Sequence, residues 1–263
     1  MMRSRTLVCV IVLSAALAAQ AQIEAVWLTH RSPTPDKTVV SWKSARPGPS
    51  QVCYGTDSSC PHEVRVAGEQ TIHHVEIPTP QRGTAIHYRV ATDGQRSETF
   101  AFQTCPEDGV RVAVVGDWAY ARRPNLTALK ADKPHLLMTA GDNVAQVINP
   151  SQPGDTRYIQ PYLNLIRSEA ELFATTPFMP ITGNHDKQVG PRENKHPGTS
   201  TEVYDVAATA FRTVFALPDP GWRWAFTIPQ ADATFLALDL HHVSDFGTTF
   251  QSCHDYHRGS EQF

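Results

Sequence analysis

Three short motifs, each placed directly after an apolar stretch, constrain the fold of this chain more than any other feature. The motifs are Gly116-Asp117 after residues 112–115, Gly141-Asp142 after residues 135–139, and Gly183-Asn184-His185-Asp186 after residues 178–182. The apolar stretches predict strands. Strands joined by helices run parallel, so their carboxyl ends share one sheet edge, where ligands bind. Because a glycine lets the backbone turn sharply off each strand, the three motifs are expected to meet at that edge.

The side chains of these motifs are donors of the kind that bind metal ions. Asp117, Asp142 and Asn184 carry hard oxygen donors, which suit divalent and trivalent cations. One Gly-Asp pair alone would more often be a turn, but three motifs at successive strand ends indicate a metal pair. Two cations about 3.5–4 Å apart can hold the attacking and leaving oxygens of a phosphoester and lower the pKa of a bound water. The pattern therefore predicts a phosphoester-cleaving site.

These motifs resemble those of the calcineurin-like metallophosphoesterases and, within them, the purple acid phosphatases. The resemblance covers the first three of the five sequence blocks of that family. It implies that Asp117 binds one metal, Asp142 bridges both, and Asn184 binds the other. It also implies that His185 contacts the phosphate or protonates the leaving group, with Asp186 orienting its imidazole. The implied cofactor is two divalent or mixed-valence metal ions: iron with zinc, manganese or a second iron.

Two positions depart from the family pattern. Ala119 replaces a glycine that is not a ligand in the family, which is a minor change. Ala145 stands where the family has the tyrosine that binds ferric iron and gives the purple colour. Neither that ligand nor that colour is therefore expected. Tyr120 is the alternative phenolate, but an aromatic residue after a strand is more often packed in the core.

The last two blocks of the family, which supply three histidine ligands, are not found in the sequence. The resemblance therefore implies a catalytic domain that is C-terminally incomplete, binds metal weakly and shows little or no turnover. His241 and His242, which follow a predicted strand over residues 233–240, are the alternative ligands. His254 and His257 lie in a polar loop and are weaker candidates.

Residues 22–105 are predicted to form a separate β-sandwich domain. Short segments rich in β-branched and aromatic residues lie between clusters of Pro, Gly and Asp, which is typical of all-β folds. These segments span residues 38–42, 73–77, 86–90 and 99–102. The region resembles the fibronectin type III-like N-terminal domain of larger purple acid phosphatases, which implies that Trp42 and Tyr88 lie in its core.

Residues 110–263 are predicted to form the second domain, after a linker over residues 106–109. Its expected architecture is that of an α/β (α-β-β-α) metallophosphoesterase domain, C-terminally incomplete. A helix capped by Asp155 and a second helix near residues 206–215 carry apolar stripes. Both helices are therefore expected to cover the sheet.

Residues 1–21 have the arrangement of a cleaved secretory signal. Arg3 and Arg5 precede an apolar run over residues 7–19, and the small residues Ala19 and Ala21 mark a cleavage site after Ala21. The alternative is a membrane anchor, but the apolar run is too short to cross about 30 Å of hydrocarbon as a helix. The sequence therefore predicts a secreted or periplasmic protein.

Export would place the cysteines that follow the signal in an oxidising compartment. The four are Cys53, Cys60, Cys105 and Cys253, which allow three pairings. A disulfide between Cys53 and Cys60 is the preferred pairing because so short a loop is easily closed. Cys105 and Cys253 could pair or remain free.

The formal charge of −3 excludes general nucleic-acid affinity and polybasic membrane contact. The expected partner is a small phosphoester, with no nucleic acid, no membrane after signal cleavage and no indication of an oligomeric state. The sequence thus predicts a secreted metal-dependent phosphohydrolase, acid phosphatase-like, that cleaves phosphate monoesters. The alternatives are a non-catalytic exported binding protein with a degenerate phosphatase remnant, and a phosphodiesterase or nucleotidase of the same superfamily.

Overall fold

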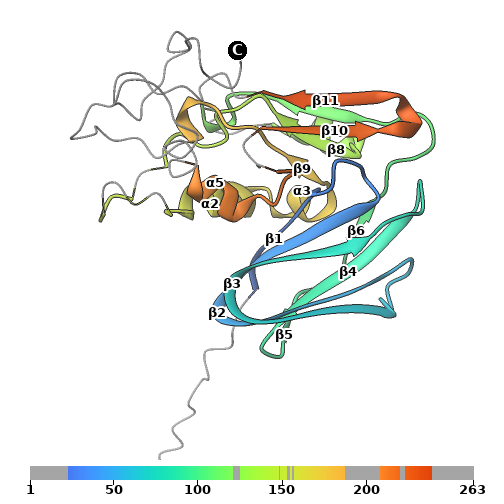
Figure 1. The fold of residues 1–263 in the computed structure, drawn as a ribbon, viewed down its shortest axis with the longest axis horizontal. Coiled ribbons are helices and arrows are strands. Elements are labelled where there is room, and N and C mark those ends of the chain that lie inside the picture. Colours follow the sequence, from blue (N-terminus) through green and yellow to red (C-terminus); the bar gives the residue numbers. More distant parts are fainter. Residues whose placement is uncertain are drawn as a thin grey trace, which may run out of the picture.

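The computed structural model describes residues 23–120, 125–147, 149–152, 155, 157–186, 208–219 and 223–238, without the side chains of Tyr120 and Asn184. The predicted secretory signal lies outside these residues. So do Cys253 and the four histidines named as alternative ligands. The described part of the chain is mostly β-sheet with a few short helices (Figure 1). None of the helices in that part is long and apolar enough to span a membrane.

The N-terminal part forms a six-stranded antiparallel sheet. Its strands are β1 (Ile23–Thr29), β2 (Lys37–Gly55), β3 (His62–Pro78), β4 (Ala85–Thr92), β5 (Gln95–Arg96) and β6 (Phe100–Gln103). The two long strands β2 and β3 pair with each other in two stretches, separated by register shifts between Lys43 and Ser50. β1 pairs with the first stretch of β2, whereas β4 pairs with the second. All four segments predicted to be strands overlap these elements.

One apolar cluster fills the interior of this N-terminal part. It contains Trp42 and Tyr88, whose side chains are both fully buried. The prediction that these two residues lie in the core is confirmed. Trp42 stacks on the ring of His73 at a centroid distance of 4.5 Å, and its Nε1 donates a hydrogen bond to Oγ1 of Thr92 at 2.8 Å.

The second part contains a three-stranded parallel sheet in the order β7 (Val112–Val115), β8 (Leu136–Thr139), β9 (Phe178–Met179). Helix α1 (Thr127–Asp132) lies between β7 and β8 in the chain, and α2 (Gln160–Ser168) and α3 (Ala170–Thr175) precede β9. Farther along, α5 (Thr209–Val214) precedes an antiparallel hairpin of β10 (Trp224–Ile228) and β11 (Ala233–Ala237). The parallel pairing predicted from the strand-end motifs is confirmed.

The predicted helix start at Asp155 is wrong. Helix α2 begins at Gln160, with Pro161 in its first turn, where the fixed φ of proline suits a helix. Asp155 instead accepts a hydrogen bond from the backbone N–H of Arg157 at 3.1 Å, which closes a turn before the helix. The second predicted helix is shorter than expected in the described residues, where it spans α5.

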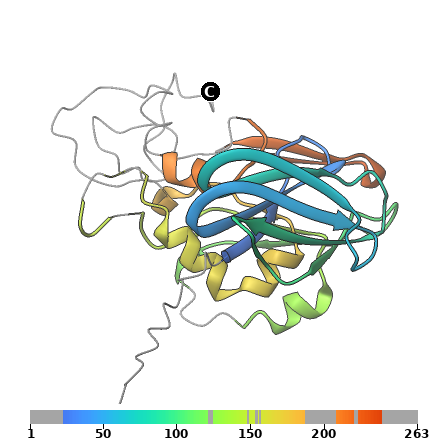
Figure 2. The same cartoon turned by 90° about the horizontal axis from the view of Figure 1, so that it is seen from below.

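Strand β1 is buried on both faces and joins the two parts of the molecule. Because successive side chains of a strand point to opposite faces, Val26 and Leu28 pack into the N-terminal cluster. Ala25 and Trp27 pack into the second cluster, between the helices and the parallel sheet. Figures 1 and 2 both show β1 lying beside the helices of the second part. The two parts therefore share continuous apolar packing.

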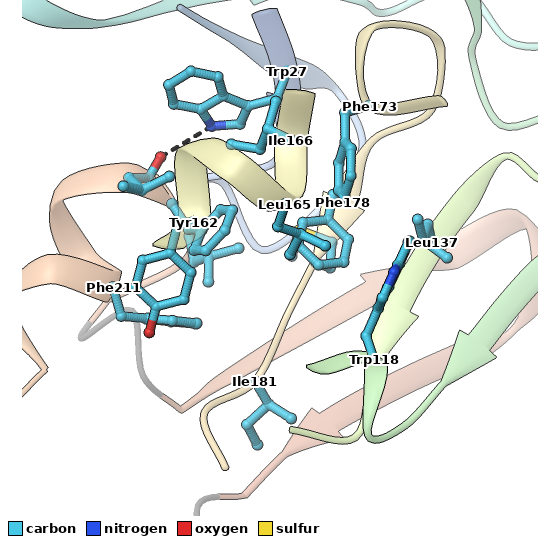
Figure 3. Packing of buried hydrophobic residues seen from close by; sticks show 14 of the residues in the cluster. Trp27, Trp118, Leu137, Tyr162, Leu165, Ile166, Phe173, Phe178, Ile181 and Phe211 are labelled. Atoms are coloured by element: carbon cyan, nitrogen blue, oxygen red, sulfur yellow. Dashed lines mark hydrogen bonds between the residues drawn. The ribbon is translucent and has the colours of Figure 1, made fainter. Parts of the chain in front are cut away.

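Three side chains of the N-terminal part also bond to helix ends of the second part. Trp27 Nε1 donates to the carbonyl of Val214 at 3.0 Å, which is the dashed line in Figure 3. Tyr88 donates its hydroxyl to the carbonyl of Ala174 at 2.7 Å, and His74 Nε2 lies 3.0 Å from the carbonyl of Thr213. The last carbonyls of a helix have no partner within the helix. The bonds from Trp27 and Tyr88 therefore satisfy buried carbonyls that would otherwise lack a donor, whereas the bond from His74 is exposed.

The predicted disulfide between Cys53 and Cys60 is not formed, and both residues, like Cys105, are free thiols. Their sulfur atoms face different neighbours. Sγ of Cys53 lies 4.0 Å from Oε2 of Glu63, whereas Sγ of Cys60 lies 3.8 Å from the carbonyl oxygen of Asp57. The backbone of Cys60 has a left-handed φ of 51°, which turns its side chain inward, and burial raises the pKa of its thiol.

Candidate metal centre at the carboxyl edge of the parallel sheet

The ends of neighbouring strands bring the sequence motifs together. Val115 at the end of β7 pairs with Thr139 at the end of β8, and the N–H of Ala140 donates to the carbonyl of Val115 at 2.8 Å. The first two motifs, which follow these residues, therefore leave the sheet side by side. The third motif follows β9, the neighbour of β8. The predicted meeting of the strand ends is confirmed.

Two predicted metal ligands have a backbone conformation that side chains rarely adopt. Asp117 has a φ of 50° and Asp142 a φ of 53°, both in the left-handed region. Only six described non-glycine residues have a positive φ, and these two follow the strands of the candidate site. Strain of this kind costs of the order of 1–3 kcal/mol, and it clusters at functional sites. The conformation reverses the chain at each strand end.

Asp142 lies at the centre of the three motifs. Its backbone carbonyl accepts a hydrogen bond from the N–H of Ala119, in the first motif loop, at 3.1 Å. Its carboxylate Oδ1 accepts a hydrogen bond from the N–H of His185, in the third motif, at 3.0 Å. Asp142 thus touches the first loop through its backbone carbonyl and the third motif through its carboxylate, so it lies between the two.

Two glycines allow this close approach. A Cβ atom at Gly183 would lie 2.1 Å from Oδ1 of Asp142. A Cβ atom at Gly141, whose φ is 97°, would lie 2.8 Å from the Cα of Gly183. Any side chain at either position would therefore push the second and third motifs apart, and this accounts for the glycines before Asp142 and Asn184.

The predicted role of Asp186, orienting the imidazole of His185, is not what the structure shows. The Nδ1 atom of His185 lies 2.7 Å from the backbone carbonyl of Ala145, which can only accept, so Nδ1 donates. Asp186 is 1% exposed and its Oδ2 bonds to Asn143 and Gly183. The backbone carbonyl of Ala145 therefore fixes the Nδ1 side of the His185 ring.

Burial changes the protonation of the groups behind the site. It raises the pKa of the Asp186 carboxyl to about 7, although the N–H donors of Gly183 and Asn143 act in the opposite direction. The nearby carboxylate of Asp142 adds to the rise. Tyr162 donates its hydroxyl to the backbone carbonyl of Asp186 at 2.7 Å, and burial holds the pKa of Tyr162 well above its usual value. Asn143 and Tyr162 were not predicted from the sequence.

The described side chains include some of the ligand types that a metal centre needs. Asp117 and Asp142 supply carboxylate oxygens, which suit hard cations, and Asn184 follows in the 3-10 helix η2 (Asn184–Asp186). Among the residues with described side chains, no group of three or more His, Cys, Asp or Glu could hold a metal ion. The side chains of Asn184 and Tyr120 lie outside that description. The described side chains therefore supply two carboxylates at this edge of the sheet and no complete coordination shell.

No family model matches the chain. No curated protein matches it either. Among solved structures, PhoD is similar to it with a TM-score of 0.58 and 18% sequence identity, over 84% of this chain and 52% of that protein. A purple acid phosphatase from seeds of yellow lupin (Lupinus luteus) is similar with a TM-score of 0.57 and 14% identity, over 82% of this chain and 45% of that protein.

These similarities show that the chain shares its fold with PhoD and with a purple acid phosphatase. The chain spans about half the length of the two solved structures it matches. At such low identity the likeness concerns the path of the backbone, and the chemistry has to be argued from the residues of this chain.

Proposed function

We propose that the chain belongs to an exported, metal-dependent phosphohydrolase that cleaves phosphate monoesters. The observation that carries this proposal is the position of Asp142, a residue with a left-handed backbone whose carbonyl contacts the first motif loop and whose carboxylate contacts the third motif. Backbone strain of this kind would be relieved by glycine, so an aspartate at this position points to a use for its side chain. The fold shared with a purple acid phosphatase supports the same reaction class.

Each motif residue has a task in this proposal. Asp117 and Asn184 bind one metal each, and Asp142 bridges the pair. When bound, the metal pair lowers the pKa of a water molecule and polarises the phosphoryl oxygens. His185 contacts the phosphate or protonates the leaving group, and its Nδ1–H bond to the carbonyl of Ala145 at 2.7 Å sets the orientation of its ring. The metal identities proposed are iron with zinc, manganese or a second iron.

We further propose that residues 22–105 form a fibronectin type III-like sandwich ahead of an α-β-β-α metallophosphoesterase domain over residues 110–263. The register shifts that divide β2 and β3 support two layers. The first layer would contain β1, the first stretch of β2 and the second of β3. The other would contain the remaining stretches with β4 and β6. Export rests on residues 1–21 of the sequence.

A non-catalytic binding protein is the second candidate function. The observation that favours it is the small donor set, since no group of three ligand side chains occurs among the described residues. A phosphodiesterase or nucleotidase activity remains the alternative within the same superfamily. The two enzyme alternatives differ only in substrate, so one set of assays separates all three.

The test is metal binding and hydrolysis by the purified chain and two matched variants. Asp142→Asn removes the bridging charge. Asp232→Asn makes the same change at an aspartate that also has a left-handed φ, 46°, after the 3-10 helix η3 (Pro229–Ala231). Each protein is titrated with Mn²⁺ and Zn²⁺ and assayed with an aryl phosphate, a bis-aryl phosphate and a nucleotide.

We expect weak metal binding and low metal-dependent monoesterase activity in the wild type and in Asp232→Asn. In Asp142→Asn the metal affinity should fall by more than about 100-fold, since loss of a ligand exceeds the 10–100-fold effect of losing a residue behind one. Metal bound at two equivalents with no ester hydrolysed would favour the binding protein. Equal metal affinity in Asp142→Asn and the wild type would refute the metal centre itself.

A further inference from the structure

One carboxylate oxygen joins the second and third motifs from behind the site. Oδ2 of Asp186 accepts hydrogen bonds from the backbone N–H of Gly183 at 2.8 Å and from the backbone N–H of Asn143 at 3.1 Å. It also accepts one from the side-chain Nδ2 of Asn143 at 3.0 Å. Asp186 and Asn143 are each 1% exposed, so water does not compete for these bonds.

The side chain of Asn143 extends this link to the strands. Its Oδ1 accepts a hydrogen bond from the hydroxyl of Thr139, the last residue of β8, at 2.6 Å. Its Nδ2 also donates to the backbone carbonyl of Ile181, after β9, at 2.8 Å. The amide of Asn143 thus ties the ends of two neighbouring strands together, with its oxygen and nitrogen each matched to a partner of the right kind.

The link sets the distance at which the two motifs face each other. With Gly183 held by Asp186, the N–H of His185 reaches Oδ1 of Asp142 at 3.0 Å. We propose that Asp186 is a positioning residue that acts through Asn143 and Gly183 to hold the Asp142 carboxylate in place for metal. This role rests on the proposed metal centre, but its geometric part can be measured without metal.

The structure separates this role from a charge effect on His185. The Nδ1 of the His185 ring bonds to the carbonyl of Ala145, and Asp186 uses Oδ2 for all three of its bonds. Its second oxygen, Oδ1, is buried and has no hydrogen-bond partner among the described residues. Asp186→Asn can keep the accepting oxygen in place, although its amide nitrogen, buried where Oδ1 lies, finds no acceptor among the described residues and lowers overall stability by roughly 1–3 kcal/mol. A positioning residue tolerates this change, and a charge partner of histidine does not.

Amide hydrogen exchange followed by NMR tests the proposal in the metal-free chain. The three informative amides are those of Asn143, Gly183 and His185, which bond to Asp186 or Asp142. In Asp186→Ala we expect these amides to exchange at least about tenfold faster. In Asp186→Asn we expect exchange within about threefold of wild type, once the change at other protected amides of the second part is subtracted. The same samples are then titrated with Mn²⁺, and Asp186→Ala should bind it about 10–100-fold more weakly.

Thr92→Val is the matched control for a general loss of stability. It removes the buried acceptor of the Trp42 Nε1 bond, in the other core of the molecule. It should speed the exchange of the three amides no more than that of other protected amides in the second part, and it should leave the affinity for Mn²⁺ unchanged. Where Asp186→Ala fails to fold, Asn143→Ala carries the same test, because it removes the side chain through which Asp186 reaches β8.

Each result decides the question. Unchanged protection of the His185 amide in Asp186→Ala, or in Asn143→Ala if that variant is used, would overturn the proposal. So would equal damage by Asp186→Asn and Asp186→Ala, which would indicate a charge role. A wild-type chain that binds no Mn²⁺ would refute the proposed function, and the exchange of the His185 amide would still show whether Asp186 positions Asp142.

Discussion

Replacing Trp27 by phenylalanine should destabilise both parts of the molecule together. Trp27 is fully buried and its Nε1 donates to the carbonyl of Val214 at 3.0 Å. Phenylalanine keeps an aromatic ring but leaves that carbonyl without its donor, which costs roughly 1–3 kcal/mol. The smaller ring also leaves a void, which costs roughly a further 1 kcal/mol. A total of about 2–4 kcal/mol is a large share of the roughly 5–15 kcal/mol that stabilises a typical domain.

The assay is unfolding in urea, monitored peptide by peptide through hydrogen exchange and mass spectrometry. Peptides from β2 and β4 report on the N-terminal part, and peptides from β8 and α2 report on the second part. Trp42→Phe is the matched control, because Trp42 is also fully buried but its Nε1 bonds to Thr92 within the N-terminal part. Since β1 contributes to both cores, we expect each variant to lower the unfolding midpoint of both sets of peptides equally.

Independent unfolding of the two parts would refute this reasoning. In that case Trp42→Phe would lower the midpoint of the β2 and β4 peptides and leave the β8 and α2 peptides unchanged. A stable proteolytic fragment that ends near Pro106 would also indicate that the N-terminal part unfolds independently of the second part. Either result would mean that the shared packing around β1 contributes little to stability.

Three further predictions concern pH, thiols and colour. Burial lowers the pKa of His73 to about 4. Unfolding therefore takes up a proton between this pKa and the ordinary value near 6.5, and lowering the pH from 7 to 5 should cost about 2 kcal/mol through this residue. In urea titrations across that range, His73→Gln should flatten the pH slope by this amount, and an unchanged slope would contradict the assignment. In native protein an alkylating reagent should modify Cys53 before the buried Cys60, as mass spectrometry would show. A disulfide between them would block both. Iron-loaded protein should lack a tyrosinate charge-transfer band, because Ala145 replaces the tyrosine; a visible band would direct attention to Tyr120.

The strand ends of the site could be predicted from the sequence because their signals are local. Each apolar stretch is short and is followed directly by glycine and a polar residue. Parallel pairing then brings the loops that carry Asp117 and Asp142 side by side through topology alone. Both aspartates have a left-handed backbone, which is the sharp turn that the sequence predicted after each strand.

The role of Asp186 could not be predicted, because it depends on contacts between segments far apart in the chain. A His-Asp pair in sequence suggests a dyad, but neighbouring residues in a 3-10 helix point in different directions, and Asp186 turns into the core. The burial of β1 on both faces had a readable signal. Residues 25–28 are four consecutive apolar residues, and a strand exposed on one face would instead alternate apolar with polar.

The left-handed aspartates set stability and function against each other. Glycine would relieve the backbone strain at Asp117 and would also remove the carboxylate. A screen of variants for thermal stability alone would therefore accept glycine at this position and erase the proposed site. In any engineering of this chain, residue 117 should be held fixed while stability is sought elsewhere.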